Sequence, residues 1–160
     1  MRGPLIGIIG AGSCEPSLEE LALEIGREIA RQDAILVCGG LSGVMTAAAR
    51  GAKEVGGFTV GILPGSSTQD ANVYIDFPIA TNMGQARNAI IVQTADVLIA
   101  VGGGYGTLSE IAMALKIGKT VVAVRNQFSI PGLHVVQTPA EAVERALASL
   151  GKHSSPTLTI

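Results

Sequence analysis

Short runs of apolar residues recur along the chain, separated by stretches in which apolar positions follow a helical spacing. The runs are rich in β-branched residues and do not alternate with polar residues, which is typical of parallel strands buried on both faces of a sheet. They predict five strands at Leu5–Ile9, Ala34–Cys38, Phe58–Leu63, Val97–Val101 and Thr120–Val124. The least regular stretch, residues 64–81, predicts a loop around one further short strand at Val73–Phe77.

Three of the intervening segments space their apolar residues as one face of an amphipathic helix does. These residues are Leu18, Leu21, Ala22, Ile25 and Ile29 in the first segment, Leu108, Ile111, Ala112 and Leu115 in the second, and Val143, Ala146, Leu147 and Leu150 in the third. Ser17 and Glu20 match a capping box and predict the start of the first helix. Strands alternating with helices predict an α/β fold, a single doubly wound, Rossmann-like parallel sheet with helices on both faces.

The sequence predicts one domain over residues 1–150. It also predicts a flexible C-terminal tail over residues 151–160, where no apolar pattern continues. Only 15% of the residues are charged, and the mean hydropathy is +0.45. One domain of this size cannot bury so much apolar surface by itself, so we expect part of it to lie in a subunit interface. A homodimer or a homotetramer is the expected assembly.

Charge and residue types weigh against several classes of protein. The net charge of −2, the pI near 5.6 and the 3% of aromatic residues argue against nucleic-acid binding, which uses basic patches and stacking rings. His134 and His153 are the only histidines, and Cys14 and Cys38 are isolated, so we expect no metal site and no disulfide framework. No apolar run reaches the ~20 residues that span a bilayer, and residues 5–9 are too short for a signal peptide. We therefore expect a cytoplasmic protein with no membrane partner.

Glycines gather directly after three of the predicted strands. If the five strands lie in the order 3-2-1-4-5, the order reverses between the first and fourth strands, and loops 10–14 and 102–107 face each other across one crevice. A glycine-rich turn before a helix exposes unpaired N–H groups that bind phosphate, although a tight turn alone would also explain each single loop. The candidate phosphate-binding residues are Gly10, Gly12, Ser13, Gly39, Gly40, Gly43, Gly103, Gly104, Tyr105, Gly106 and Thr107.

Two common nucleotide-binding fingerprints are not met by these loops. Glu15 stands where the dinucleotide fingerprint has its third glycine, which weighs against NAD and against an oxidoreductase. Residues 102–107 lack the Lys-Ser/Thr ending of a nucleoside-triphosphate loop. The expected partner is therefore a small phosphorylated ligand, and no cofactor is required.

Three polar side chains each allow two interpretations. Thr107 and Glu110 match a second capping box, but the Thr107 hydroxyl could equally contact a phosphate while Glu110 faces the crevice as a base or ribose ligand. Arg87 shares a helix face with apolar residues at positions 90 and 91. Its guanidinium either extends along that face into solvent or enters the crevice, where it would pair with Glu110 or with the ligand.

The string Gly102–Glu110, preceded by Arg87, resembles the signature of the LOG-like Rossmann superfamily. That superfamily includes the cytokinin-activating phosphoribohydrolases, once mislabelled lysine decarboxylases, and the molybdenum cofactor carrier proteins. The enzymes have Pro, Met and Lys where this chain has Gly102, Gly84 and Asn88. In these departures the chain looks more like the carrier branch.

The resemblance implies a nucleotide-binding domain with one of two functions. The first, which we expect, is a binding or carrier protein for an AMP-like ligand or the molybdenum cofactor, with Asn88 among the ligand-binding residues. The second is a phosphoribohydrolase that cleaves the N-glycosidic bond of a nucleoside 5′-monophosphate. In that enzyme Glu110 would stabilise the oxocarbenium-like transition state, and Arg87 would neutralise the phosphate or the departing base. Neither hypothesis makes the protein a lysine decarboxylase.

Overall fold

The computed structural model of the protein describes residues 2–151 and contains one seven-stranded parallel sheet. The strands are β1 (Leu5–Gly10), β2 (Ile35–Cys38), β3 (Thr59–Leu63), β4 (Phe77–Ala80), β5 (Val97–Val101), β6 (Val121–Val124) and β7 (His134–Val135). They lie in the order β4-β3-β2-β1-β5-β6-β7. The strand order reverses between β1 and β5, as it does in doubly wound α/β folds.

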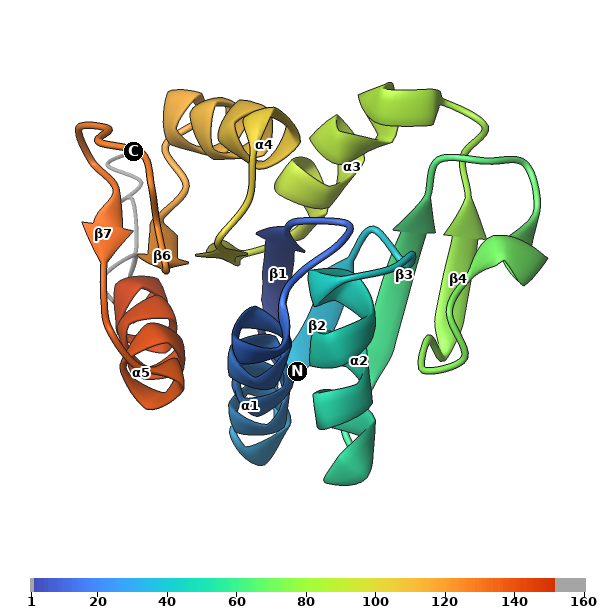
Figure 1. Ribbon diagram of the computed structural model, residues 1–160, viewed down its shortest axis with the longest axis horizontal. Helices are drawn as coiled ribbons and strands as arrows, with labels where there is room; N and C mark the ends of the chain where they lie inside the picture. The colour runs from blue at the N-terminus through green and yellow to red at the C-terminus, as the bar shows by residue number, and fades with distance from the viewer. Residues whose placement is uncertain (1, 152–160) are drawn as a thin grey trace, which may run out of the picture.

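Helices cover both faces of this sheet. The helices are α1 (Pro16–Arg31), α2 (Val44–Glu54), α3 (Arg87–Thr94), α4 (Tyr105–Lys116) and α5 (Pro139–Leu150). Helices α1, α2 and α5 lie on one face, and α3 and α4 lie on the other (Figure 1). Two short 3₁₀ helices, η1 (Thr68–Asp70) and η2 (Gly84–Ala86), lie in the connections on either side of β4.

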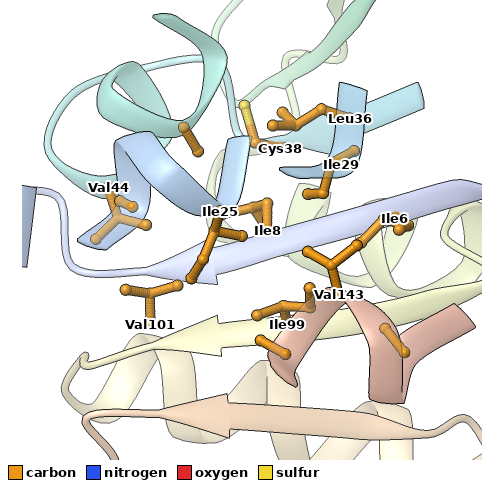
Figure 2. Close-up of a cluster of buried hydrophobic side chains, with 14 of the residues drawn as sticks. Ile6, Ile8, Ile25, Ile29, Leu36, Cys38, Val44, Ile99, Val101 and Val143 are labelled. Carbon is orange, nitrogen blue, oxygen red and sulfur yellow. The ribbon is translucent and has the colours of Figure 1, made fainter. Parts of the chain in front are cut away.

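Each face of the sheet has its own apolar core. Figure 2 shows the core under α1, α2 and α5, where Ile8, Ile99 and Ile25 come together, none of them more than 1% exposed. On the opposite face, Ile9 of β1 packs in a second cluster with Ile111 of α4. Neighbouring residues of β1 thus enter different cores, which explains why the apolar runs of the sequence do not alternate with polar residues.

The predicted sheet is confirmed, with its five strands in the order β3-β2-β1-β5-β6. Strand Val97–Val101 has the predicted bounds, and the other four differ from the prediction by one residue. The prediction of a further strand at Val73–Phe77 is wrong, because the chain turns at that point and the strand is β4 instead. Thr59 Oγ1 holds this turn by donating to Tyr74 O (2.6 Å) and accepting from Asp76 N (2.9 Å). Strand β7, only two residues long, has no predicted counterpart.

The capping box predicted for the first helix is also wrong. Helix α1 begins at Pro16, after Glu15, and neither residue caps it through a side chain. Ser17 Oγ donates a hydrogen bond to Glu15 Oε1 (2.8 Å) rather than accepting one from the backbone. Proline at the first helical position starts the helix without needing an N–H partner.

Two further expectations concern the C-terminal tail and the absence of a membrane-spanning segment. Of the tail predicted at residues 151–160, residues 152–160 lie outside the described residues. Within residues 2–151, no helix has both the length and the hydropathy that crossing a membrane requires.

Candidate functional site

A cavity of about 320 Å³ opens at the carboxyl ends of the central strands, beside the reversal between β1 and β5. The loop after β1, the loop after β2, the start of α3 and the turn into α4 all contribute to its wall, so the predicted crevice is present. Nine predicted site residues line this cavity, namely Gly10, Gly12, Gly39, Arg87, Asn88, Gly104, Gly106, Thr107 and Glu110.

The other predicted residues lie beside the cavity rather than in its wall; they are Ser13, Gly40, Gly43, Gly103 and Tyr105. Ser13 and Tyr105 are exposed to solvent next to lining residues, and Tyr105 is 90% exposed. The three glycines have positive φ angles and shape the loops that carry the lining residues.

Sequence analysis missed the apolar part of the wall, which consists of Ile8, Ile9, Ala11, Met45 and Ile91. Ile8 and Ile9 belong to a buried strand, and Ile91 is 1% exposed on the inner face of α3. Such residues look like ordinary core positions in a sequence. The one signal that could have found them is adjacency, since Ile8, Ile9 and Ala11 flank the predicted residue Gly10.

Arg87, the first residue of α3, enters the cavity and is held there by the backbone. Its Nη1 donates to Gly39 O (2.7 Å) and to Ile62 O (2.6 Å), at the carboxyl ends of β2 and β3. Glycine at position 39 leaves room for this contact, because a Cβ atom there would lie too close to Arg87 Nη1 and would displace the guanidinium. Burial lowers the pKa of Arg87, and the negative charge of Glu110 acts in the opposite direction. The interpretation in which Arg87 extends into solvent is thus excluded.

Asn88 orients Arg87 and is itself oriented by it. Arg87 Nε donates to Asn88 Oδ1 (2.7 Å). Because a guanidinium has only donors, the amide oxygen of Asn88 must face Arg87, and its Nδ2 is left for other partners. Among residues 2–151, Arg87 Nη2 also has no hydrogen-bond partner. The two side chains together therefore offer free N–H groups in the wall of the cavity.

Glu110 is a buried acid, only 7% exposed, in the cavity wall. Within the described chain its carboxylate makes no hydrogen bond and lies in no ion pair closer than 4 Å. Burial raises the pKa of Glu110 to about 7, against an opposing effect of the Arg87 charge. An acid with so few partners is poised to change its protonation near neutral pH.

Of the two interpretations of Thr107 and Glu110, the structure excludes the capping box. Helix α4 begins at Tyr105 after Gly104, with no side-chain cap, so Thr107 lies inside the first turn. Its side chain is buried, with 3% exposure, on the same helix face as Glu110 three residues later. Gly104, Gly106 and Thr107 bring the start of α4 to the cavity, and the first N–H groups of a helix attract anions.

Comparison with known proteins gives the family and the relatives of the chain. The SLOG cluster4 family matches residues 4–157. An uncharacterized protein of Archaeoglobus fulgidus is 49% identical over 144 residues, which cover 90% of this chain and 95% of that protein. A cytokinin riboside 5′-monophosphate phosphoribohydrolase of Mycobacterium tuberculosis is 36% identical over 104 residues, covering 63% of this chain and 56% of the enzyme.

Two solved structures share the fold over nearly their whole length. The molybdenum cofactor binding protein from Rippkaea orientalis has a TM-score of 0.89 and 36% identity, with 94% of this chain and 99% of that chain covered. The molybdenum cofactor carrier protein from Chlamydomonas reinhardtii has a TM-score of 0.84 and 40% identity, with coverage of 92% and 99%. These similarities confirm the resemblance to LOG-like proteins and to their carrier branch. Because the family match spans nearly the whole chain, the protein belongs to the SLOG cluster4 family.

Proposed function

We propose that this protein binds and carries a phosphorylated, nucleotide-like ligand, with the molybdenum cofactor as the first candidate cargo. The observation that carries the proposal is that the start of α4 and the guanidinium of Arg87 converge in one cavity. Both attract anions, the helix through its free N–H groups and Arg87 through its charge. Similarity to a molybdenum cofactor binding protein and to a molybdenum cofactor carrier protein supports the same ligand class.

Arg87 favours an anionic ligand because only some of its donors are used by the protein. Backbone oxygens and Asn88 occupy Nη1 and Nε, which leaves the two N–H groups of Nη2 for a ligand. A guanidinium fixed in this way loses little side-chain entropy when it binds a phosphate. The cavity volume of 320 Å³ is near the lower end of the ~300–1,000 Å³ range of small-molecule sites, so a dinucleotide would extend well beyond it.

Departures from the hydrolase pattern favour carriage over cleavage. Gly84 has a φ of +56°, in the region that glycine favours, so the enzymes' Met would be strained there. Asn88 accepts a hydrogen bond from Arg87, which a Lys side chain could not do. Glu110 is the one acid among the described lining residues, and with a pKa of about 7 it is partly neutral at pH 7. Stabilisation of an oxocarbenium ion requires the charged carboxylate.

The alternative function, phosphoribohydrolase activity on a nucleoside 5′-monophosphate, has one specific observation in its favour. Arg87 and Glu110, which match the arginine and the glutamate that the enzymes use, line the same cavity. A carboxyl group with a pKa of about 7 would also suit a general acid. The similarity to the M. tuberculosis phosphoribohydrolase is in keeping with this alternative.

One set of measurements separates the two functions. In thermal-shift and calorimetric titrations we expect AMP and a phosphorylated pterin to stabilise the protein, and NAD to have little effect. Protein expressed in a host that makes the molybdenum cofactor should retain molybdenum and a pterin, and wild type should release no adenine from AMP. Adenine release that Glu110→Gln abolishes without loss of melting temperature would establish the hydrolase instead. No shift with any phosphorylated ligand would overturn both functions.

We also infer that a second copy of the chain covers an exposed apolar surface at the β4 edge of the sheet. Phe77 and Ile79 of β4 are 55% and 47% exposed, and they pair in register with Val60 and Ile62 of β3. The ring of Phe58, 57% exposed, lies 6.4 Å from that of Phe77. Light scattering should give at least twice the 16.3 kDa chain mass, and Phe77→Asp should lower it. A monomer at tens of micromolar wild type would contradict the inference.

We place this function in the cytoplasm, and the state of the thiols supports that location. Cys14 and Cys38 are both free, and Cys38 is buried. Burial raises the pKa of Cys38 to about 11, so its thiol stays protonated and unreactive at neutral pH. Free thiols persist in reducing compartments.

A further inference from the structure

The cavity contains both the start of α4, which attracts anions, and the buried acid Glu110. The two groups lie about one helical turn apart. Glu110 follows Gly106 by four positions and Thr107 by three, so all three share one face of α4. The start of α4 favours a negatively charged ligand, whereas an ionised Glu110 repels it. Glu110 is only 7% exposed, so solvent screens that repulsion poorly.

Only one other charge faces Glu110 within residues 2–151. Arg87, from α3, acts on Glu110 through its field, but its Nη1 and Nε are bound to Gly39, Ile62 and Asn88 rather than to the carboxylate. From β2, the Cys38 thiol contributes no charge at neutral pH, since burial raises its pKa to about 11. The loops after β1 and β2 contribute glycine and apolar residues to the cavity lining. A ligand anion and an ionised Glu110 would therefore compete for Arg87.

We propose that Glu110 takes up a proton from solvent when the anionic ligand binds, and that the neutral carboxylic acid then donates a hydrogen bond to an acceptor atom of the ligand. Glu110 thus acts as a specificity-determining residue that selects ligands with an oxygen or ring-nitrogen acceptor near their phosphate. This inference rests on the proposed binding of a phosphorylated ligand.

The acidity of Glu110 in the free protein makes this exchange accessible. Burial brings its pKa to about 7, so that the protonated and ionised forms are similarly populated near neutral pH. A negative ligand nearby raises the pKa further, which drives proton uptake. By linkage, the affinity for the ligand then falls up to about tenfold for each pH unit above 7, because Glu110 must be protonated before or as the ligand binds.

Calorimetric titration with AMP at pH 6, 7 and 8 tests the inference on the full chain. Wild type and Glu110→Gln are compared, since Gln imitates the neutral acid in shape and can also donate. Glu20→Gln is the matched control, because Glu20 is exposed on α1 and outside the cavity. Taking the ratio of wild-type to Glu110→Gln affinity removes the titration of the AMP phosphate itself.

We expect this ratio to fall about tenfold between pH 6 and pH 8, and the Glu20→Gln protein to follow wild type. Repeating the pH 8 titration in two buffers of different ionisation enthalpy should give an uptake of about one proton more for wild type than for Glu110→Gln. A ratio that is constant with pH, with equal proton uptake in both proteins, would overturn the inference and leave the proposed AMP binding intact. No AMP binding to either protein at any of these pH values would overturn both.

Discussion

Two groups of charged side chains in this molecule have opposite electrostatic character. On the outer surface of α1 and α2, Arg27 bridges Glu24 (2.9 Å) and Glu54 (2.5 Å). Hydrogen bonds to Arg27 lower the pKa of both Glu24 and Glu54, and the same bonds raise the pKa of Arg27. Every shift favours the charged form, so this network is satisfied in the folded chain.

In the cavity, Arg87 and Glu110 shift in the other direction. Burial lowers the pKa of Arg87 and raises that of Glu110 to about 7, so both shifts disfavour the charged form. The fold thus keeps two ionisable groups in a position that is unfavourable for their charged forms. Unfavourable burial of this kind, at the carboxyl ends of strands, is characteristic of binding sites, whereas paired surface charges are not.

The largest expected effect that tests this contrast is on stability at the cavity. With a folded pKa of about 7, above the ordinary value of 4.5, Glu110 contributes stability below pH 4.5 that is lost as the pH rises through 7. Glu110→Gln has no carboxylate to ionise, so it should be more stable than wild type by about 3 kcal/mol at pH 8. The gain should shrink progressively toward pH 4.5.

Urea unfolding of both proteins at pH 5 and pH 8 measures this difference. Glu20→Gln, which removes an exposed carboxylate from α1, should show no comparable gain. If Glu110→Gln were no more stable than wild type at pH 8, the acid would be satisfied in the folded protein, and the contrast between the two regions would disappear.

The second effect is on ligand affinity and concerns Arg87. Arg87→Ala should weaken AMP binding about 10- to 150-fold, which corresponds to the roughly 1.5–3 kcal/mol of a charge-assisted hydrogen bond. Arg87→Lys should recover only part of the affinity, since a single ammonium cannot hold two backbone oxygens and Asn88 and still offer two parallel donors.

Calorimetric titration with AMP provides the comparison, and Arg31→Ala is its matched control. Arg31 also pairs with glutamates, but on the α1 surface away from the cavity. Unchanged AMP affinity in Arg87→Ala, or an equal loss in Arg31→Ala, would mean that Arg87 makes no direct contact with the ligand.

The strands show how much of the fold could be predicted from the sequence alone. The buried strands and the crevice follow from local signals, and residues 97–101 have the predicted bounds because both faces of that strand are covered. The strand at residues 77–80 is predicted too early in the chain, because Pro78 interrupts its apolar run, and proline is tolerated in a sheet mainly at an edge such as β4. Position in the fold, which the sequence does not state, decides such cases.

The orientation of the site residues depends still more on tertiary contacts. The spacing of Thr107 and Glu110 suits a cap, but the helix begins at Tyr105, so both residues lie inside it and face the cavity. The partners that hold Arg87 include the backbone oxygens of Gly39 and Ile62, and any residue type supplies a backbone oxygen. The residue types therefore predicted which loops meet, but they could not predict the interactions that hold the site side chains in place.

The smallest effect is expected in the surface network, and it completes the comparison. Arg27→Ala breaks two ion pairs at once, with Glu24 and Glu54, yet these groups remain hydrated when they lose their partner. We expect the melting temperature to fall by about 2 °C at most, with AMP affinity unchanged. About 0.5 M NaCl should remove most of that difference, because salt screens exposed charges far more than buried ones. Differential scanning calorimetry at low and high salt measures both quantities. A large, salt-insensitive loss would show that the α1–α2 network is as tightly coupled to the fold as the cavity pair, and that burial alone does not separate the two regions.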